Sequence, residues 1–198
     1  TGELVESELG MIPKGWRVGK LGEICKITMG QSPPGESYNE SGIGTLFFQG
    51  RADFDFRFPR ERVYTTDPRR FAHKFDTLVS VRAPVGDMNM AAENCCIGRG
   101  LAAVMEKFGN YSFSYYFLKT LVKKFKSFED SGTVFGSINK DEFESLACIL
   151  PSFQIIASFQ EKYKVIDDEI YNREQESKIL AKIRDSLLPK LMNGEIEV

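Results

Sequence analysis

Residues 152–188 read SFQIIASFQEKYKVIDDEIYNREQESKILAKIRDSLL, a stretch without a single glycine or proline. Such a stretch predicts one continuous helix, which at 1.5 Å per residue would be more than about 50 Å long. Few globular helices run so long, because a small domain cannot cover them. Pro189 and Gly194 are expected to end the helix. The sequence therefore predicts two parts, a domain over residues 1–150 and a projecting helix with a short tail over residues 151–198.

Apolar side chains recur along this segment at intervals of three and four residues, meet Arg173 and Ser177, and then resume. A seam of this spacing is typical of a coiled coil, in which each helix needs a partner. We therefore predict self-association through this helix. The polar interruption disfavours a long parallel homodimer, but it could set the register or pair across helices. The alternative is that the helix folds back on residues 1–150. The residues predicted to face a partner helix are Ile156, Phe159, Tyr163, Ile166, Ile170, Leu180, Ile183 and Leu187.

The first part of the chain has the pattern of a β-rich domain with a few helices, so the fold class is predicted to be α+β. Charged and aromatic residues alternate over 53–58, which is typical of a strand with one apolar face. Short apolar runs predict further strands at 46–48, 77–81 and 101–105. Apolar residues spaced by four indicate an amphipathic helix over 111–128.

Asn139 is a predicted cap for a short helix over residues 140–146. Trp16, the single tryptophan, is expected to anchor the core. Five phenylalanines near the alternating segment are also expected in the core rather than at a binding surface. They are Phe54, Phe56, Phe58, Phe71 and Phe75.

Charge is distributed unevenly along the chain. The net charge is −2, which argues against a protein that coats nucleic acid without selectivity. Eight of the eleven arginines nevertheless lie between Arg51 and Arg99. The planar arginine fork suits phosphate and guanine contacts. The alternative interpretation is that these arginines pair with neighbouring acids at the surface.

The sequence lacks the residues and motifs that most catalytic sites require. There is one histidine, His73, and no C-x-x-C pair, so neither a histidine-based metal site nor a zinc site is predicted. There is no nucleotide-binding glycine loop. No apolar run approaches the roughly 20 residues that span a bilayer, and the first ten residues hold three glutamates and no base. The four cysteines are expected to be reduced thiols, so a cytoplasmic location without membrane contact is predicted.

Four sequence blocks resemble the specificity subunits of type I DNA restriction–modification systems, in the same order and around a similar long helix. The family often has Glu-Gln shortly after the proline that opens the helix, where this chain has Ile155 and Ile156. The four blocks are SELGMIPKGW at 7–16 followed by LGEI at 21–24, DTLVSVRAPVG at 76–86, GTVFGSINK at 132–140 and LLPKLMNGEI at 187–196.

This resemblance implies a non-catalytic DNA-recognition subunit. Such subunits carry two target-recognition domains, each followed by a long helix, and the two helices pack antiparallel as a spacer between DNA half-sites. Methyltransferase subunits, which use S-adenosylmethionine, and motor-nuclease restriction subunits, which need ATP and Mg²⁺, would join it on double-stranded DNA. The chain itself would hold no cofactor and no metal. It looks like half of such a subunit, either a natural half-length form or a C-terminal half.

The side chains expected to contact DNA fall into three groups. Base readers are sought among Gln49, Arg51, Arg57 and Arg60, because arginine pairs best with guanine and glutamine with adenine. Arg62, in the same stretch, is also expected to bind DNA. Phosphate contacts are expected from Arg69, Arg70, Lys74 and Arg82, although Arg82 could instead pin a loop. A loop with Thr133 and Phe135 is a further candidate.

Two other functions compete with this interpretation. The first is a coiled-coil scaffold whose β domain binds protein, for which the arginine concentration would have no purpose. The second is a self-contained nuclease or methyltransferase, for which the sequence lacks a cofactor loop and the Asn/Asp-Pro-Pro-aromatic motif of adenine methylation.

Overall fold

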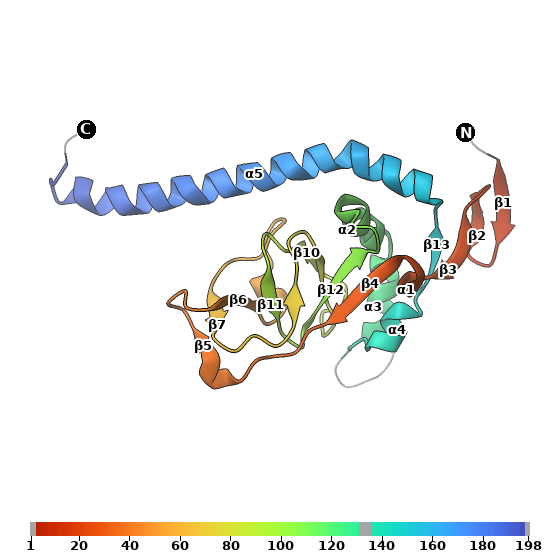
Figure 1. Ribbon diagram of the computed structural model, residues 1–198, viewed down its shortest axis with the longest axis horizontal. Helices are drawn as coiled ribbons and strands as arrows, with labels where there is room; N and C mark the ends of the chain where they lie inside the picture. Colours follow the sequence, from red (N-terminus) through yellow and green to blue (C-terminus); the bar gives the residue numbers. More distant parts are fainter. Residues whose placement is uncertain (1–2, 131–135, 197–198) are drawn as a thin grey trace. The chain divides into compact units, whose positions relative to one another are not determined.

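The computed structural model describes residues 3–130 and 136–196, and its fold class is α+β, as predicted. The chain forms two units, one ending at Gln160 and the other beginning at Glu161. Figure 1 shows the strands of the first unit and the long helix α5, Phe153–Met192. The predicted boundary at residue 150 is therefore too early, because the first turns of α5 belong to the first unit.

Four sheets make up the β structure of the described residues. One has the order β10-β9-β12-β4, one the order β5-β7-β6-β11-β8, and the pairs β1-β2 and β13-β3 are two-stranded. The strands are β1 Leu4–Ser7, β2 Gly10–Pro13, β3 Arg17–Lys20, β4 Cys25–Met29, β5 Tyr38–Asn39, β6 Thr45–Phe48, β7 Val63–Thr65, β8 Phe71–Ala72, β9 Thr77–Ser80, β10 Met88–Met90, β11 Cys95–Ile97, β12 Leu101–Glu106 and β13 Ala147–Leu150.

Strand β12 lies at the centre of the first unit, and both of its faces are buried. Ala102 and Val104 point into the core beneath the helices. Leu101 and Ala103 point into a second core, shared with β6 and β11 of the five-stranded sheet. Because successive side chains of a strand alternate between faces, a continuous apolar run such as β12 requires cover on both sides. The four-stranded sheet is therefore the middle layer of three.

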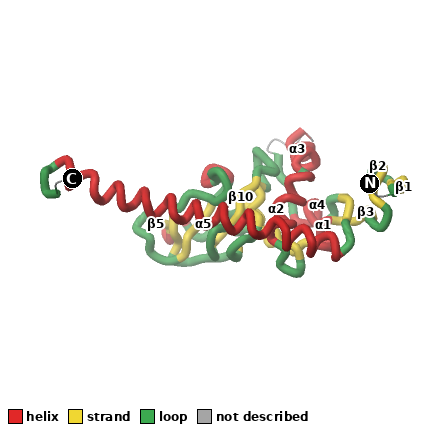
Figure 2. The backbone as a smooth tube through the Cα atoms, turned by 90° about the horizontal axis from the view of Figure 1, so that it is seen from above, coloured by secondary structure: helices red, strands yellow, loops and turns green. Residues whose placement is uncertain are grey.

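The helices cover the opposite face of the middle sheet from the five-stranded sheet. The predicted helix over 111–128 is two helices that meet at Leu121, whose N–H donates to the carbonyl of Leu118 at 2.9 Å. Phe125 and Phe143 then pack edge to face at 5.2 Å in the core. The helices, which Figure 2 shows in red, are α1 Leu21–Ile24, α2 Tyr111–Thr120, α3 Val122–Asp130, α4 Lys140–Glu144 and α5, with 3₁₀ turns η1 Gly35–Ser37 and η2 Arg51–Asp53.

The short helix predicted after Asn139 is confirmed as α4, and the Asn139 side chain accepts the N–H of Glu142. The predicted strand over 53–58 is wrong. Asp53 ends the 3₁₀ turn η2. The backbone of Asp55 bonds to the Asn89 side chain instead of to a neighbouring strand. The Asn89 amide accepts the Asp55 N–H at 3.1 Å and donates to the Asp55 carbonyl at 2.9 Å. Local side-chain bonds to the backbone thus replace the ladder that the alternation predicts.

The long helix is confirmed, but Pro189 does not end it. The helix continues to Met192 and closes at Gly194, whose φ is +70°. The N–H of Glu195 donates to the carbonyl of Lys190 at 2.9 Å, as in a glycine-capped helix end. The first turns of α5 bind α2, because the Gln160 side chain accepts the backbone N–H of Ser112 at 2.9 Å.

All four cysteines are free and buried. Burial raises the pKa of Cys25 and Cys95 far above the ordinary range and that of Cys148 to about 11. Because the thiolate is the reactive form, we expect iodoacetamide at pH 8 to leave the native thiols unmodified and to label all four after unfolding in guanidinium. Intact-protein mass measures this, and rapid labelling of the native chain would contradict it.

Candidate nucleic-acid interface

One end of the five-stranded sheet carries a row of polar side chains, here called the strand-end row, formed by Arg62, Gln49, Arg99 and Arg70. β6 and β11 run parallel with Ile97 beside Phe48, so the residues that follow each strand, Gln49 and Arg99, leave at the same end. β7 and β8 run antiparallel to them, so the residues that precede those strands, Arg62 and Arg70, lie at that end too. Figure 1 shows β6 between β7 and β11.

A groove of about 600 Å³ opens at this row, and Gln49, Arg62 and Arg99 line it. The buried carboxylate of Asp53 organises one side of it. Asp53 accepts the N–H of Gln49 at 2.9 Å and the guanidinium of Arg62 at 2.5 Å. The groove is therefore built from hydrogen-bonded side chains that are already oriented.

Four of the predicted DNA-contacting arginines are engaged in ion pairs within the domain. The alternative interpretation from the sequence, that local acids hold these arginines, is confirmed for them. Their N–O distances are 2.5–2.7 Å, and the hydrogen bond from Arg60 lowers the pKa of Asp55, so that pair is charged at neutral pH. The pairs are Arg51–Asp87, Arg60–Asp55, Arg62–Asp53 and Arg69–Asp67.

Arg57 is not a base reader, because it is 7% exposed. Its guanidinium lies 4.3 Å from the ring centre of Tyr115 and donates to the Tyr116 hydroxyl at 3.2 Å. Its carbonyl accepts the N–H of Met90. Arg57 thus fastens the loop before β7 to α2.

Of the remaining predicted contact residues, one lies in the strand-end row and others lie elsewhere in the domain. Arg70 is exposed in the strand-end row. Lys74 follows the other end of β8, and its ammonium lies 4.8 Å from the Phe75 ring centre, so the structure does not bring it to the row. Arg82 is exposed and bridges Ser137 through its backbone, while its neighbour Val81 donates to the carbonyl of Gly100. Thr133 and Phe135 lie outside the described residues.

Arg99 was not among the predicted contacts, yet it lies in the strand-end row, and several aromatic residues lie elsewhere than predicted. Arg99 follows β11 between two glycines, and only the pairing of β6 with β11 brings it to Gln49. Phe58 is buried, as predicted, but Phe56 and Phe71 are 76% and 44% exposed. Phe54 and Phe75 are partly buried.

Two residues of the predicted helix-partner face are covered by the domain itself. Ile156 is 3% exposed, and the Phe159 ring lies 6.0 Å from Phe113 and 5.9 Å from Tyr116. They join α5 to α2 and are not available to a second helix. Further along α5, Ile166, Leu180, Ile183 and Leu187 are between 42% and 59% exposed, and Tyr163 and Ile170 belong to the same seam.

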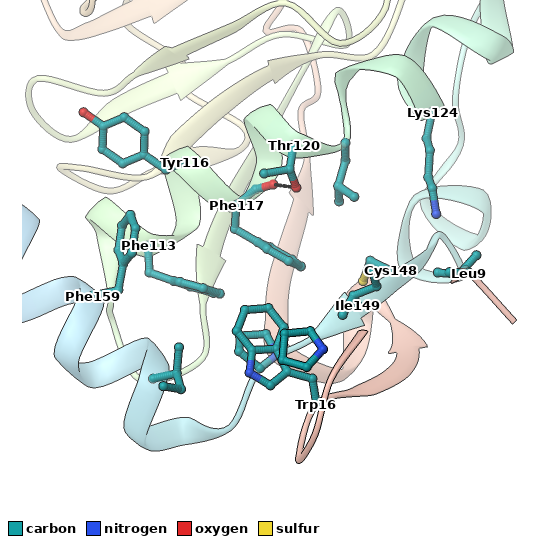
Figure 3. A pocket seen from close by; sticks show the side chains of 14 residues that line it. Leu9, Trp16, Phe113, Tyr116, Phe117, Thr120, Lys124, Cys148, Ile149 and Phe159 are labelled. Carbon is teal, nitrogen blue, oxygen red and sulfur yellow. Dashed lines mark hydrogen bonds between the residues drawn. The ribbon is translucent and has the colours of Figure 1, made fainter. Parts of the chain in front are cut away.

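A second hollow, of about 570 Å³, is apolar and lies beside the start of α5. Figure 3 shows Trp16, Phe113, Phe117, Ile149 and Phe159 around it. Trp16 is therefore a half-buried residue of this apolar hollow and not the core anchor that we predicted.

No cluster of three or more metal-ligating side chains occurs among residues 3–130 and 136–196. Within the same ranges, no helix combines the length and the apolar character that crossing a bilayer requires.

The chain belongs to the family of type I restriction modification DNA specificity domains, whose family model matches residues 13–183. This confirms the resemblance carried by the four sequence blocks.

Individual proteins that this chain resembles are described as specificity subunits of the same kind of system. The chain is 39% identical, over 98% of its length, to a Methanocaldococcus jannaschii protein described as the MjaX specificity subunit of a type I restriction enzyme. It is 26% identical, over 93% of its length, to the HindI specificity subunit of Haemophilus influenzae. The crystal structure of the HsdS subunit from Thermoanaerobacter tengcongensis superimposes over 98% of the chain with a TM-score of 0.66 and 32% identity. The chain spans 46%, 42% and 48% of these three proteins, respectively.

Proposed function

We propose that this chain is a non-catalytic DNA-recognition module of a type I restriction–modification complex, and that its globular domain reads one half-site. The observation that carries the proposal is the strand-end row, where Gln49, Arg62 and Arg99 from the ends of β6, β7 and β11 line one groove. Arginine and glutamine are the side chains that pair best with guanine and adenine edges. Membership of the DNA specificity family supports the same function.

The module would direct partner subunits that hold the catalytic centres. Methyltransferase subunits would bring S-adenosylmethionine, and motor-nuclease restriction subunits would bring ATP and Mg²⁺. No cofactor is assigned to this chain. The site of action would be the cytoplasm of a prokaryote, where the DNA is.

Two copies would together read a split site. The exposed apolar residues of α5, such as Leu180 and Ile183, are the ones that a second helix would cover. Joining two identical chains by a twofold axis would make the two half-sites inverted repeats of each other.

The test is DNA selection by the full chain co-purified with a methyltransferase subunit from the same source. From a random double-stranded pool we expect enrichment of a split motif, bound with an affinity that falls steeply as salt rises. Recovery of the pool without enrichment, with affinity independent of salt, would contradict the proposal and favour a protein-binding scaffold.

Arg70→Ala tests the division between positioning and reading. Arg70 is exposed, and it has no ion pair among the residues that the structure describes. As a phosphate contact, its loss is expected to weaken binding to all sequences alike and to reduce the slope of log affinity against log salt by about 1 per contact. Fluorescence anisotropy across a salt series measures both quantities. A change in the enriched motif would contradict the phosphate role.

A further inference from the structure

The turn Gly98-Arg99-Gly100, between β11 and β12, is packed closely against Gln49, with no room for a side chain at Gly100 and little at Gly98. A Cβ at Gly98 would lie 3.0 Å from Gln49 Oε1, and one at Gly100 would lie 2.7 Å from the Gln49 carbonyl. The Gly98 N–H also donates to the carbonyl of Phe48 at 2.8 Å. This turn therefore has a fixed backbone and presents a single side chain, that of Arg99.

Ser32 joins the turn to Gln49. Its Oγ accepts the backbone N–H of Arg99 at 3.2 Å and the side-chain amide of Gln49 at 3.1 Å. Three segments distant in sequence thus meet at one hydroxyl. The Gln49 amide is held in one orientation, with its oxygen 3.5 Å from the same Ser32 hydroxyl. Its second N–H and the second lone pair of its oxygen remain for another partner.

Arg99 differs from Arg62, the other arginine that lines this groove, in having no carboxylate partner among the described residues. Across the groove, Arg62 is bound to Asp53. Arg99 is exposed, and no ion pair joins it to any residue within 3–130 or 136–196. Its planar fork of donors is therefore available to a ligand in the groove, beside an amide that is already oriented.

We propose that Arg99 and Gln49 read neighbouring base pairs of the half-site, a proposal that rests on the DNA-recognition function above. Arg99 would bind guanine through O6 and N7, and Gln49 would bind adenine through N6 and N7, both in the major groove. Ser32 is a positioning residue, because it fixes Gln49 without reaching the DNA itself. Both contacts use preformed geometry, which lowers the entropic cost of ordering the side chains on binding.

The experiment maps adenine methylation in cells that express the full chain with its methyltransferase subunit, and compares variants. For Arg99→Ala we expect one guanine position of the motif to relax, with a loss of preference of about 5- to 150-fold. Gln49→Ala should relax the adjacent adenine position instead, and Ser32→Ala should relax that position partly while the guanine is retained. Arg17→Ala is the matched control. Arg17 lies on β3, pairs with Glu23 of α1 and is outside the groove.

Arg99→Lys separates reading from charge, because lysine keeps the positive charge but loses the bidentate fork. We expect Arg99→Lys to relax the same guanine position. An unchanged motif in both Arg99 variants, or a uniform loss of methylation at every site, would overturn the proposal in favour of a phosphate contact. If the unmodified chain directed no methylation at all, the DNA-recognition function would fail, and this inference with it.

Discussion

Asp53→Ala is expected to weaken selective DNA recognition at least about tenfold while leaving the domain folded. The Asp53 side chain is 7% exposed, and its carboxylate holds the N–H of Gln49 and the guanidinium of Arg62. Removing it takes the acceptor from the part-buried N–H of Gln49 and from the Arg62 guanidinium, which costs about 1 kcal/mol of folding free energy. Gln49 and Arg62 also lose their orientation, so we expect methylation of the motif to fall at least about tenfold. Chemical denaturation and methylation mapping measure the two effects.

The matched control is Asp67→Ala, which removes a carboxylate from an ion pair with Arg69 whose side chains are both 46% exposed. Exposed pairs of this kind contribute about 0–1 kcal/mol, so the control should keep both stability and motif. Asp53→Asn keeps an acceptor for the Gln49 N–H and should retain more activity than alanine. Equal methylation by Asp53→Ala and Asp67→Ala would show that the groove does not depend on Asp53.

The double substitution Leu180→Glu with Ile183→Glu is expected to prevent self-association. Leu180 is 59% exposed and Ile183 is 48% exposed, so neither is needed to hold its own chain together. Each apolar side chain buried in a helix pair contributes about 1.5–3 kcal/mol, and the pair of changes should weaken dimerisation by about 10²- to 10⁴-fold. Sedimentation equilibrium measures the dissociation constant directly.

Lys182→Glu is the control, because it changes the net charge by the same amount on the far side of the helix. We expect it to dimerise as the unmodified chain does. If the double variant associated as strongly as the control, another surface would join the copies, and the proposed seam would be wrong.

The sequence predicted the long helix, three strands and the helix after Asn139, because these depend on local patterns of period and capping. It failed over 53–58, where alternation predicts a strand. There, Asp53 and Asn89 bind the backbone, and Arg57 packs on Tyr115. Asn89 is 34 residues from Asp55, and Tyr115 is 58 residues from Arg57, so no local window contains these two partners.

The candidate site was predicted only in part for the same reason. The concentration of arginines indicated the region that holds the candidate site, but the sequence could not show which arginines aspartates hold and which remain available. The role proposed for Arg99 depends on the parallel pairing of β6 with β11, a long-range contact. Ile156 and Phe159 fitted the coiled-coil spacing equally well whether α5 packs on its own domain or on a partner.

The most direct measurement of the central claim is the adenine methylome of cells that express the full chain with its methyltransferase subunit, compared with cells that express either alone. Our account predicts a new methylated motif, split into two inverted half-sites, that is present only when both proteins are expressed. The absence of any new motif, with the two proteins still co-purifying, would contradict the claim that this chain supplies DNA recognition.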